Sequence, residues 1–203
     1  MILTLPANMR YDCMCATIKS KVLWQEPPEA HGLSLIASEK GKEAAMNEQA
    51  KKEALRLFTY GLYAISSGDE AEKNAFTANW LSQVSFDPPL VALSIERTSA
   101  SLPIIRRTKR FVINVFGEEQ RQLAGQLGKS LVKHPDKLEG VAFGATPDGS
   151  PILPETLAWV ACEVESETSA GDSILLLARV VDAGVLRQGE SLTMRAAGFK
   201  HAG

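Results

Sequence analysis

Small polar side chains recur along residues 74–89, NAFTANWLSQVSFDPP, at a spacing that could serve a planar, polar ligand. Hydroxyl and amide groups alternate there with apolar residues, so one strand could offer hydrogen bonds to the edge of a ring and apolar contact to its face. The candidate contacts are Thr77, Ala78, Asn79, Trp80, Leu81, Ser82, Gln83 and Ser85. On composition alone, a polar strand that faces solvent explains the pattern better.

A second stretch, residues 90–108, could bind an anion. The sequence LVALSIERTSASLPIIRRT runs from an apolar strand pattern through hydroxyl residues into a short helical pattern. Pro103 is tolerated only in a first helical turn, which favours Ser101 or a near neighbour as the N-cap. Free amides at that helix start would suit a phosphate, and basic side chains flank them. The candidates are Arg97, Thr98, Ser99, Ser101 and Arg106; a capped surface helix with solvated arginines is an equally good reading.

Several other chemistries are disfavoured by the spacing of the residues. Gly128, Lys129 and Ser130 resemble the end of a phosphate-binding P-loop, but Leu123 stands where that motif needs a glycine. GxGxxG is missing, and GESLT at residues 189–193 lacks the closing glycine of a nucleophile elbow. No metal site is expected, because the three histidines are far apart and Cys13 and Cys15 are only two ligands.

The elements that must position these residues are mostly strands. Period-2 runs bounded by turn residues predict six strands, at GLYAIS, FTANWLSQVS, LVALSIE, FVINVF, LAWVACEVE and SILLLARVVDAGVL. Within LAWVACEVE, Ala158, Val160, Cys162 and Val164 share one face. A helix is predicted to begin at Met46 and another to cover residues 117–131. The pattern suggests a mainly β, antiparallel barrel with a few flanking helices.

Composition and charge set the wider expectations. Residues 1–45 show no sustained period and are predicted to be a loosely ordered extension, and residues 46–203 are predicted to be the folded domain. The net charge of -2, with lysines and arginines scattered among acids, argues against a nucleic-acid partner. Three cysteines cannot all pair within the chain, and no apolar run is long enough to cross a bilayer, so a cytoplasmic protein without a membrane partner is expected.

The order NAFTANWLSQVSFDPPLVALSI, a Ser/Thr-rich turn, then KRFVINVF resembles the flavin reductase-like, FMN-binding split-barrel family. The resemblance covers Leu57 to Val185. It implies a homodimer built on a six-stranded Greek-key split β-barrel, with flavin near the subunit interface. It also implies that Thr77 to Leu81 lie along the isoalloxazine and ribityl chain, that Ser82, Gln83 and Ser85 add polar contacts, and that the phosphate is received by Thr98, Ser99 and Ser101 with Arg97 or Arg106.

The implied activity is hydride transfer from NAD(P)H to FMN or FAD, with reduced flavin passed to an acceptor or a partner monooxygenase. No side chain need act as acid or base. One departure is Gly171, Asp172, Ser173, where many members have Gly-Asp-His and the histidine is associated with the nicotinamide side. Two alternatives therefore stay open: a flavoredoxin-like protein that keeps FMN and exchanges electrons with a redox protein, and a non-enzymatic flavin-binding module.

Overall fold

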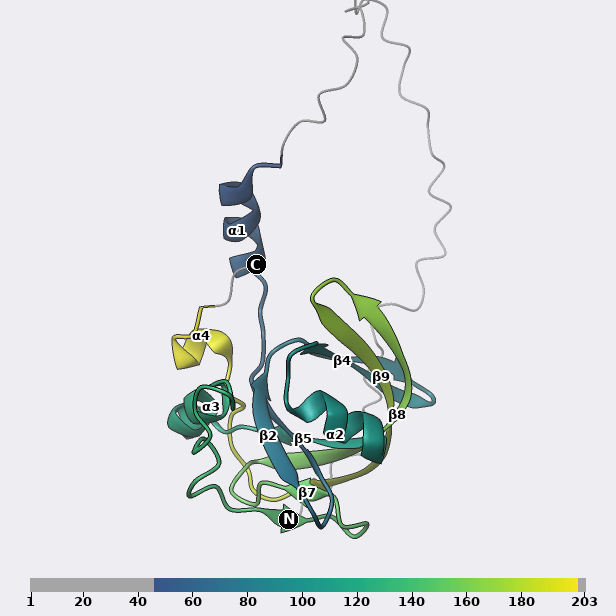
Figure 1. Cartoon of the computed structure of the whole chain (residues 1–203). Helices are drawn as coiled ribbons and strands as arrows, with labels where there is room; N and C mark the ends of the chain where they lie inside the picture. Colours follow the sequence, from purple (N-terminus) through teal and green to yellow (C-terminus); the bar gives the residue numbers. More distant parts are fainter. Residues whose placement is uncertain (1–45, 201–203) are drawn as a thin grey trace, which may run out of the picture. The chain divides into compact units, whose positions relative to one another are not determined.

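The computed structural model describes residues 46–200, and its main element is a seven-stranded antiparallel sheet that curves into a barrel (Figure 1). Its strands run in the order β2-β1-β5-β8-β9-β4-β3. They are β1 (Tyr63–Gly68), β2 (Lys73–Ala78), β3 (Leu81–Phe86), β4 (Pro89–Glu96), β5 (Arg110–Val115), β8 (Ala158–Ala170) and β9 (Ser173–Val185). The predicted extension, residues 1–45, lies outside the described residues, as do Cys13 and Cys15.

The mainly β fold is confirmed, but the strand count differs from the six that were expected. The predicted strand FTANWLSQVS is two strands, because the chain turns at Asn79 and Trp80 between β2 and β3. These two strands stand at opposite ends of the sheet order and are not paired with each other. The barrel is therefore split where the chain passes from β2 to β3. A separate small sheet pairs β6 (Gly144–Ala145) with β7 (Pro151–Ile152).

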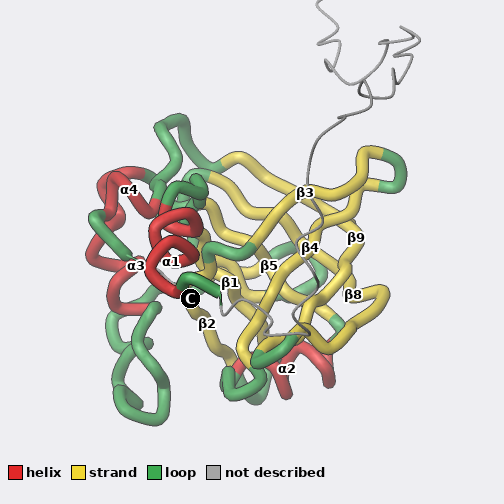
Figure 2. The backbone as a smooth tube through the Cα atoms, turned by 90° about the horizontal axis from the view of Figure 1, so that it is seen from above, coloured by secondary structure: helices red, strands yellow, loops and turns green. Residues whose placement is uncertain are grey.

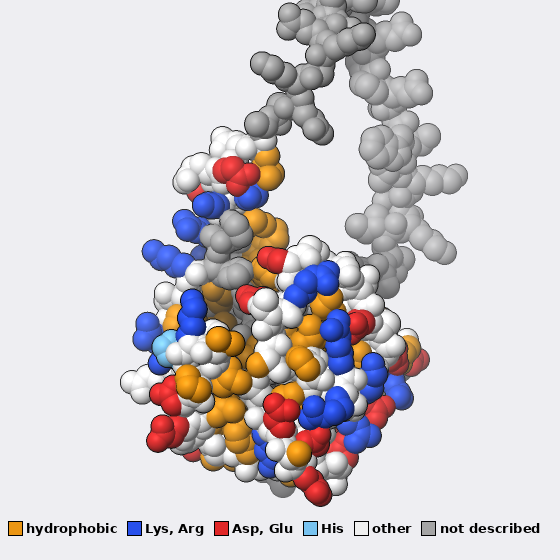
Figure 3. Space-filling view, in the orientation of Figure 1, with side chains coloured by type: hydrophobic (Ala, Val, Ile, Leu, Met, Phe, Trp, Pro, Cys, Tyr) orange, Lys and Arg blue, Asp and Glu red, His pale blue; other side chains and the backbone are white. Residues whose placement is uncertain are grey.

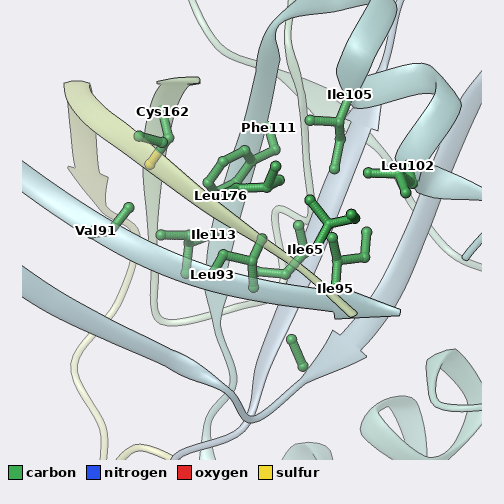
Figure 4. Close-up of a cluster of buried hydrophobic side chains, with 13 residues drawn as sticks. Ile65, Val91, Leu93, Ile95, Leu102, Ile105, Phe111, Ile113, Cys162 and Leu176 are labelled. Atoms are coloured by element: carbon green, nitrogen blue, oxygen red, sulfur yellow. The ribbon is translucent and has the colours of Figure 1, made fainter. Parts of the chain in front are cut away.

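The barrel interior is filled by apolar side chains that alternate along the strands. Leu93 and Ile95 of β4, Phe111 of β5 and Leu176 of β9 are all buried in this cluster (Figure 4). The predicted face of LAWVACEVE joins it through Val160, Cys162 and Val164, because alternate residues of a strand point to the same side. This cluster is the main core.

A second apolar layer packs on the outside of β1 and β2. Ile65 of β1 points into the barrel, whereas its neighbour Ala64 points outward and meets Phe116 and Leu127 in the second cluster. Buried polar groups tie this layer together. The Asn114 side-chain amide donates to the Ala64 carbonyl (3.1 Å) and to Ser66 Oγ (2.8 Å), while its oxygen accepts from the amide of Leu153 (2.8 Å).

The helices begin close to where the sequence predicts them. The helix α1 (Glu48–Arg56) is capped by Asn47, whose side chain accepts from the Ala50 amide at 3.0 Å. The region 117–131 forms the 3-10 turn η1 (Glu118–Gln120) and the helix α3 (Arg121–Leu127). The short helix α4 (Met194–Ala197) was not predicted; it lies near α3 on one side of the barrel, where Ala197 and Ala124 are buried in the same cluster (Figure 2).

The helix α2 (Ser101–Thr108) covers one end of the barrel, and Leu102 and Ile105 reach its core (Figure 1). Charged residues stay outside. Lysines and arginines are interspersed with acids over the visible face, with apolar surface between them (Figure 3). Among the described residues, none of the helices has the length and apolarity that crossing a membrane requires.

Candidate functional site

A hollow of about 240 Å³, partly open to solvent, lies against β2, beside the split in the barrel. Four pieces of chain converge on it: β2 with the turn that follows, the end of β4, the turn before α2, and the segment after α3. The lining residues are Asn74, Phe76, Thr77, Ala78, Asn79, Trp80, Ser94, Ile95, Glu96, Thr98, Ser99, Ala100, Leu127, Gly128, Lys129, Ser130, Leu131, Val132 and Lys137. Pieces distant in sequence thus form one concave surface of mixed polarity.

The strand wall of the hollow contains four of the predicted ring contacts, Thr77 to Trp80. The Thr77 hydroxyl donates to the carbonyl of Ala124 in α3 at 2.7 Å. The Asn79 amide lies 3.1 Å from the sulfur of Met194 in α4. Both side chains therefore anchor β2 to the outer layer, which fixes the backbone edge that faces the hollow.

The turn before α2 contributes Thr98, Ser99 and Ala100 to the same hollow. The helix begins at Ser101, as the position of Pro103 in its first turn requires, but the N-cap is Ala100 and makes no side-chain hydrogen bond. A near neighbour of Ser101 is thus the cap, without a capping hydroxyl. The Ser99 hydroxyl instead accepts a long bond, 3.4 Å, from the Ser101 amide. Hydroxyls and a helix start face the hollow together.

The other predicted residues lie off this lining. Arg97 donates to the Gly171 carbonyl at 3.0 Å, and Arg106 forms a two-point ion pair with Glu167, its shorter bond 2.9 Å long. The Ser101 hydroxyl is buried and has no hydrogen-bond partner in the described part of the chain. On β3, Leu81 packs against the barrel core, while Ser82, Gln83 and Ser85 follow along the edge strand. The hollow thus brings together only part of the predicted set.

The basic wall of the hollow was missed from the sequence. Lys129, Ser130 and Lys137 come from the segment after α3. The GKS triplet was considered only as part of a P-loop, and the structure does place a helix before it and not a strand. Burial lowers the pKa of the Lys137 ammonium below its usual value, because the charged form loses its hydration. The Gly-Lys-Ser triplet directly after a helix was the available signal.

Ser173, which stands where the resembling family often has histidine, lies beside the hollow. It is buried at the start of β9, in register with Glu96, which lines the hollow. Its hydroxyl donates to the Asp172 carboxylate at 3.0 Å. A short side chain therefore holds this position, and no imidazole reaches from it.

Two further chemistries find no support among residues 46–200. No group of three or more histidine, cysteine or acidic side chains there is arranged to hold a metal ion. Burial raises the pKa of the Cys162 thiol to about 12, so this cysteine is a core side chain and not a nucleophile. Neither competes with the hollow as a functional site.

Comparison with known proteins places the chain in a family. Residues 55–203 match the model of the flavin reductase like domain, and the chain belongs to that family. It is 30% identical over 160 residues to the reductase subunit HsaB of a flavin-dependent monooxygenase from Rhodococcus jostii, a match that covers 79% of this chain and 78% of that protein. The split-barrel fold is shared with solved structures of the family. The styrene monooxygenase flavin reductase of Pseudomonas putida S12 superposes with a TM-score of 0.62 at 29% identity, covering 71% of this chain and 91% of that one.

The length of the relatives varies. The chain is 34% identical over 142 residues to a high molecular weight rubredoxin from Moorella thermoacetica, a match that covers 69% of this chain and 62% of that protein. It spans less than two thirds of several curated relatives that it matches. Those longer proteins contain further regions that this chain does not match.

Proposed function

We propose that the chain binds FMN in the hollow and acts as an NAD(P)H-dependent flavin oxidoreductase that passes reduced flavin to an acceptor or a partner oxygenase. The observation that carries this proposal is the convergence of Thr77 to Trp80 with Thr98 to Ala100 on one hollow. These are two of the stretches that the sequence assigns to a flavin ring and to its phosphate. Family membership and the relatives named as reductase subunits support the same activity.

The lining fits a flavin nucleotide in its chemistry. A strand backbone with Thr77 and Asn79 offers donors and acceptors for a ring edge, and Phe76, Ala78 and Ile95 offer apolar contact. Thr98 and Ser99 in the turn before α2 offer hydroxyls and amides for a 5'-phosphate. Arg97 and Arg106, which lie off the lining, would add positive charge from beyond the rim. Ser82, Gln83 and Ser85 would contribute as the neighbouring edge strand.

A bound flavin would supply the redox chemistry, taking a hydride from a reduced nicotinamide nucleotide. The chain's own residues would position the ring and shield it from water. No side chain is assigned as a general acid or base. We also propose that the protein is a homodimer, because apolar side chains are exposed on and beside the edge strand β3, where Val84 is 52% and Phe86 81% exposed. Cytoplasmic location remains a prediction.

The experiment is anaerobic mixing of the flavin-loaded protein with NADH or NADPH, followed through the visible absorption of oxidised flavin. Rapid bleaching by one nucleotide is the expected result. Failure of FMN and riboflavin to bind, measured by quenching of flavin fluorescence, would contradict the proposal at its first step. Light scattering after gel filtration tests the dimer in the same preparation.

A second candidate is an electron-transfer flavoprotein that keeps its FMN, and Ser173 is the observation that favours it. Without an imidazole at position 173, reduction by a nicotinamide nucleotide is expected to be slower. FMN that co-elutes in gel filtration and is bleached by neither nucleotide, but accepts electrons from dithionite, would favour this candidate. A non-enzymatic flavin-binding module would be indicated if the reduced protein passed electrons to no acceptor tested.

A further inference from the structure

A separate hollow of about 350 Å³ lies where the end of α1 meets α4, two helices on the same side of the barrel (Figure 1, Figure 2). One wall of this helix-end hollow is formed by residues 56–60, and the other by residues 193–195 with Phe199 and Lys200. It shares no lining residue with the hollow proposed for flavin, the flavin hollow. A second concave surface is therefore open to a ligand of its own.

Three cations border the helix-end hollow: Arg56, Arg195 and Lys200, all of them exposed. No acidic side chain lines it, and within residues 46–200 no carboxylate pairs with any of the three. Elsewhere on the described surface, ion pairs with acidic residues are formed by Arg106, Arg107, Arg110, Arg179 and Arg187. The helix-end hollow is thus a locally positive surface on a chain whose net charge is -2.

Aromatic and sulfur-containing side chains supply much of the remaining lining. Phe58 is 60% exposed, and its ring centre lies 6.3 Å from that of Tyr60, with the planes tilted by 42°. Phe199 borders the hollow from the other wall, and the Arg121 guanidinium lies over its ring, 5.6 Å from the centre. Met194 adds a thioether, a favourable neighbour for an aromatic ring. Exposed rings of this kind favour a planar aromatic ligand.

Backbone hydrogen bonds tie the two walls of the helix-end hollow together. The Met194 amide donates to the Tyr60 carbonyl at 3.0 Å, and the Leu62 amide donates to the Leu192 carbonyl at 2.9 Å. Beyond α4, the Phe199 amide donates to the Met194 carbonyl at 3.0 Å. The walls are therefore held in place before any ligand arrives, which lowers the entropy cost of binding.

The backbone beside the three cations favours a singly charged anion. The end of α1 at this hollow is its C-terminus, where the carbonyls carry partial negative charge. The amides of Leu57 and Phe58 already donate to the carbonyls of Ala54 (3.1 Å) and Leu55 (3.2 Å). An anion must therefore be held by the cationic side chains alone. Guanidinium groups match the two oxygens of a carboxylate, whereas a phosphate dianion would be repelled more strongly by the helix end.

We propose that the helix-end hollow binds a planar aromatic carboxylate, with Arg56 and Arg195 receiving the carboxylate and Phe58 and Phe199 contacting the ring. Ligand pockets span roughly 300 to 1,000 Å³, so this hollow suits an acid with one or two rings. The inference does not rest on the proposed function, because the site and its ligand are both distinct from those of flavin. A structural explanation competes: each arginine stands in the last turn of a helix, where a cation stabilises the helix end.

The test is calorimetric titration of benzoate and naphthoate into the protein, with and without FMN. Arg56→Gln and Arg195→Gln are each expected to weaken binding roughly tenfold, as loss of a charge-assisted hydrogen bond predicts. Arg195→Lys should recover part of that loss. The matched control is Lys52→Gln, at an exposed lysine one turn earlier in α1 that borders neither hollow, and it should change the affinity less than about twofold. Because the substituted side chains are exposed, all variants should keep the melting temperature of the unaltered protein.

Related compounds test the two halves of the ligand. Naphthamide has the ring without the charge, and cyclohexanecarboxylate has the charge without the aromatic ring. Each should bind roughly tenfold more weakly than naphthoate, or worse, if both halves are recognised. AMP carries a ring with a phosphate. Tighter binding of AMP than of either carboxylate, weakened in both arginine variants, would overturn the proposal in favour of a nucleotide.

Three other results would contradict the carboxylate site. The first is that neither benzoate nor naphthoate binds the unaltered protein. The second is binding that disappears when FMN is present, because the acid would then occupy the flavin hollow. The third is equal affinity in all variants with a lower melting temperature in the arginine variants, which would assign those arginines to the helix ends. Failure of FMN to bind would instead contradict the proposed function, and the titrations without FMN would still decide this inference.

Discussion

The interior of the barrel and the layer outside it share strands β1 and β2, yet they contain different kinds of side chain. The interior cluster is apolar throughout, and its one cysteine, Cys162, is kept as an uncharged thiol by burial that raises its pKa to about 12. The outer layer buries Asn114 and Lys137 among its apolar residues. Its segments are short helices and turns whose backbone groups need partners that a sheet supplies for itself. The barrel thus provides the frame and the strand wall of the hollow, and the outer layer adds the lysine wall.

The sharpest way to test this contrast is to remove volume from each region. Leu93→Ala creates a cavity in the barrel interior, where Leu93 is fully buried, and should lower the free energy of unfolding by about 2 to 5 kcal/mol. Val132→Ala, at a side chain on the rim of the hollow that is 88% exposed, should stay within about 0.5 kcal/mol. Denaturant unfolding followed by tryptophan fluorescence measures both. Equal losses would show that the barrel is not the principal source of stability.

A second test uses the pH dependence of stability, which the buried lysine should alter. Burial lowers the pKa of Lys137 below 10.5 in the folded protein, so the unfolded chain keeps its proton to higher pH than the native one. The unfolding free energy should therefore rise with pH between the lowered pKa and about 10.5, relative to Lys137→Met. Urea unfolding of both proteins at several alkaline pH values gives the difference. A flat difference would mean that the lysine is solvated in the folded state.

The smallest expected effect is at the rim. Arg106 is held by Glu167 in an exposed ion pair outside the hollow, so Arg106→Ala should weaken FMN by less than about fivefold and riboflavin not at all. Glu167→Ala is the matched variant, since it frees the arginine and should leave FMN binding equal or tighter. Fluorescence titration measures both. A loss for FMN of a hundredfold or more in Arg106→Ala would move the phosphate from the turn at Thr98 to Ala100 toward this arginine.

The strands and the strand wall of the hollow were predictable because their side chains alternate with period two, a local property of the sequence. The break between β2 and β3 was not predictable in the same way, because neither residue of the pair Asn79 and Trp80 is a glycine or proline, the residues that mark a turn most strongly. The basic wall was also missed. Gln126 of α3 donates to the carbonyls of Lys137 and Glu139, and this tertiary contact leaves no periodic pattern in the sequence.

The phosphate candidates were also predicted only in part, because their orientation depends on tertiary contacts. The start of α2 followed from Pro103, whose ring restricts the position it can take in a helix. Which side chains face the hollow depends on the direction in which the barrel presents that helix. Thr98 and Ser99 line it, whereas Arg106, in the last turn of α2, meets Glu167 on β8. Residue type and spacing identified the region, and only the fold separates the lining residues from their neighbours.

The hydrogen bonds of Asn114 bear on the order in which segments of the chain fold and dock. Its amide joins β1, its own strand β5 and the backbone at Leu153, so all three must be in place before its hydrogen bonds form. The pairing of β1 with β5 needs no contribution from the segment around Leu153, but the docking of that segment needs the finished pair. The outer layer can therefore open and reclose while the barrel stays intact. Since α3 and the lysine wall belong to this outer layer, we expect that side of the hollow to open at a lower free energy than the strand wall, which belongs to the barrel.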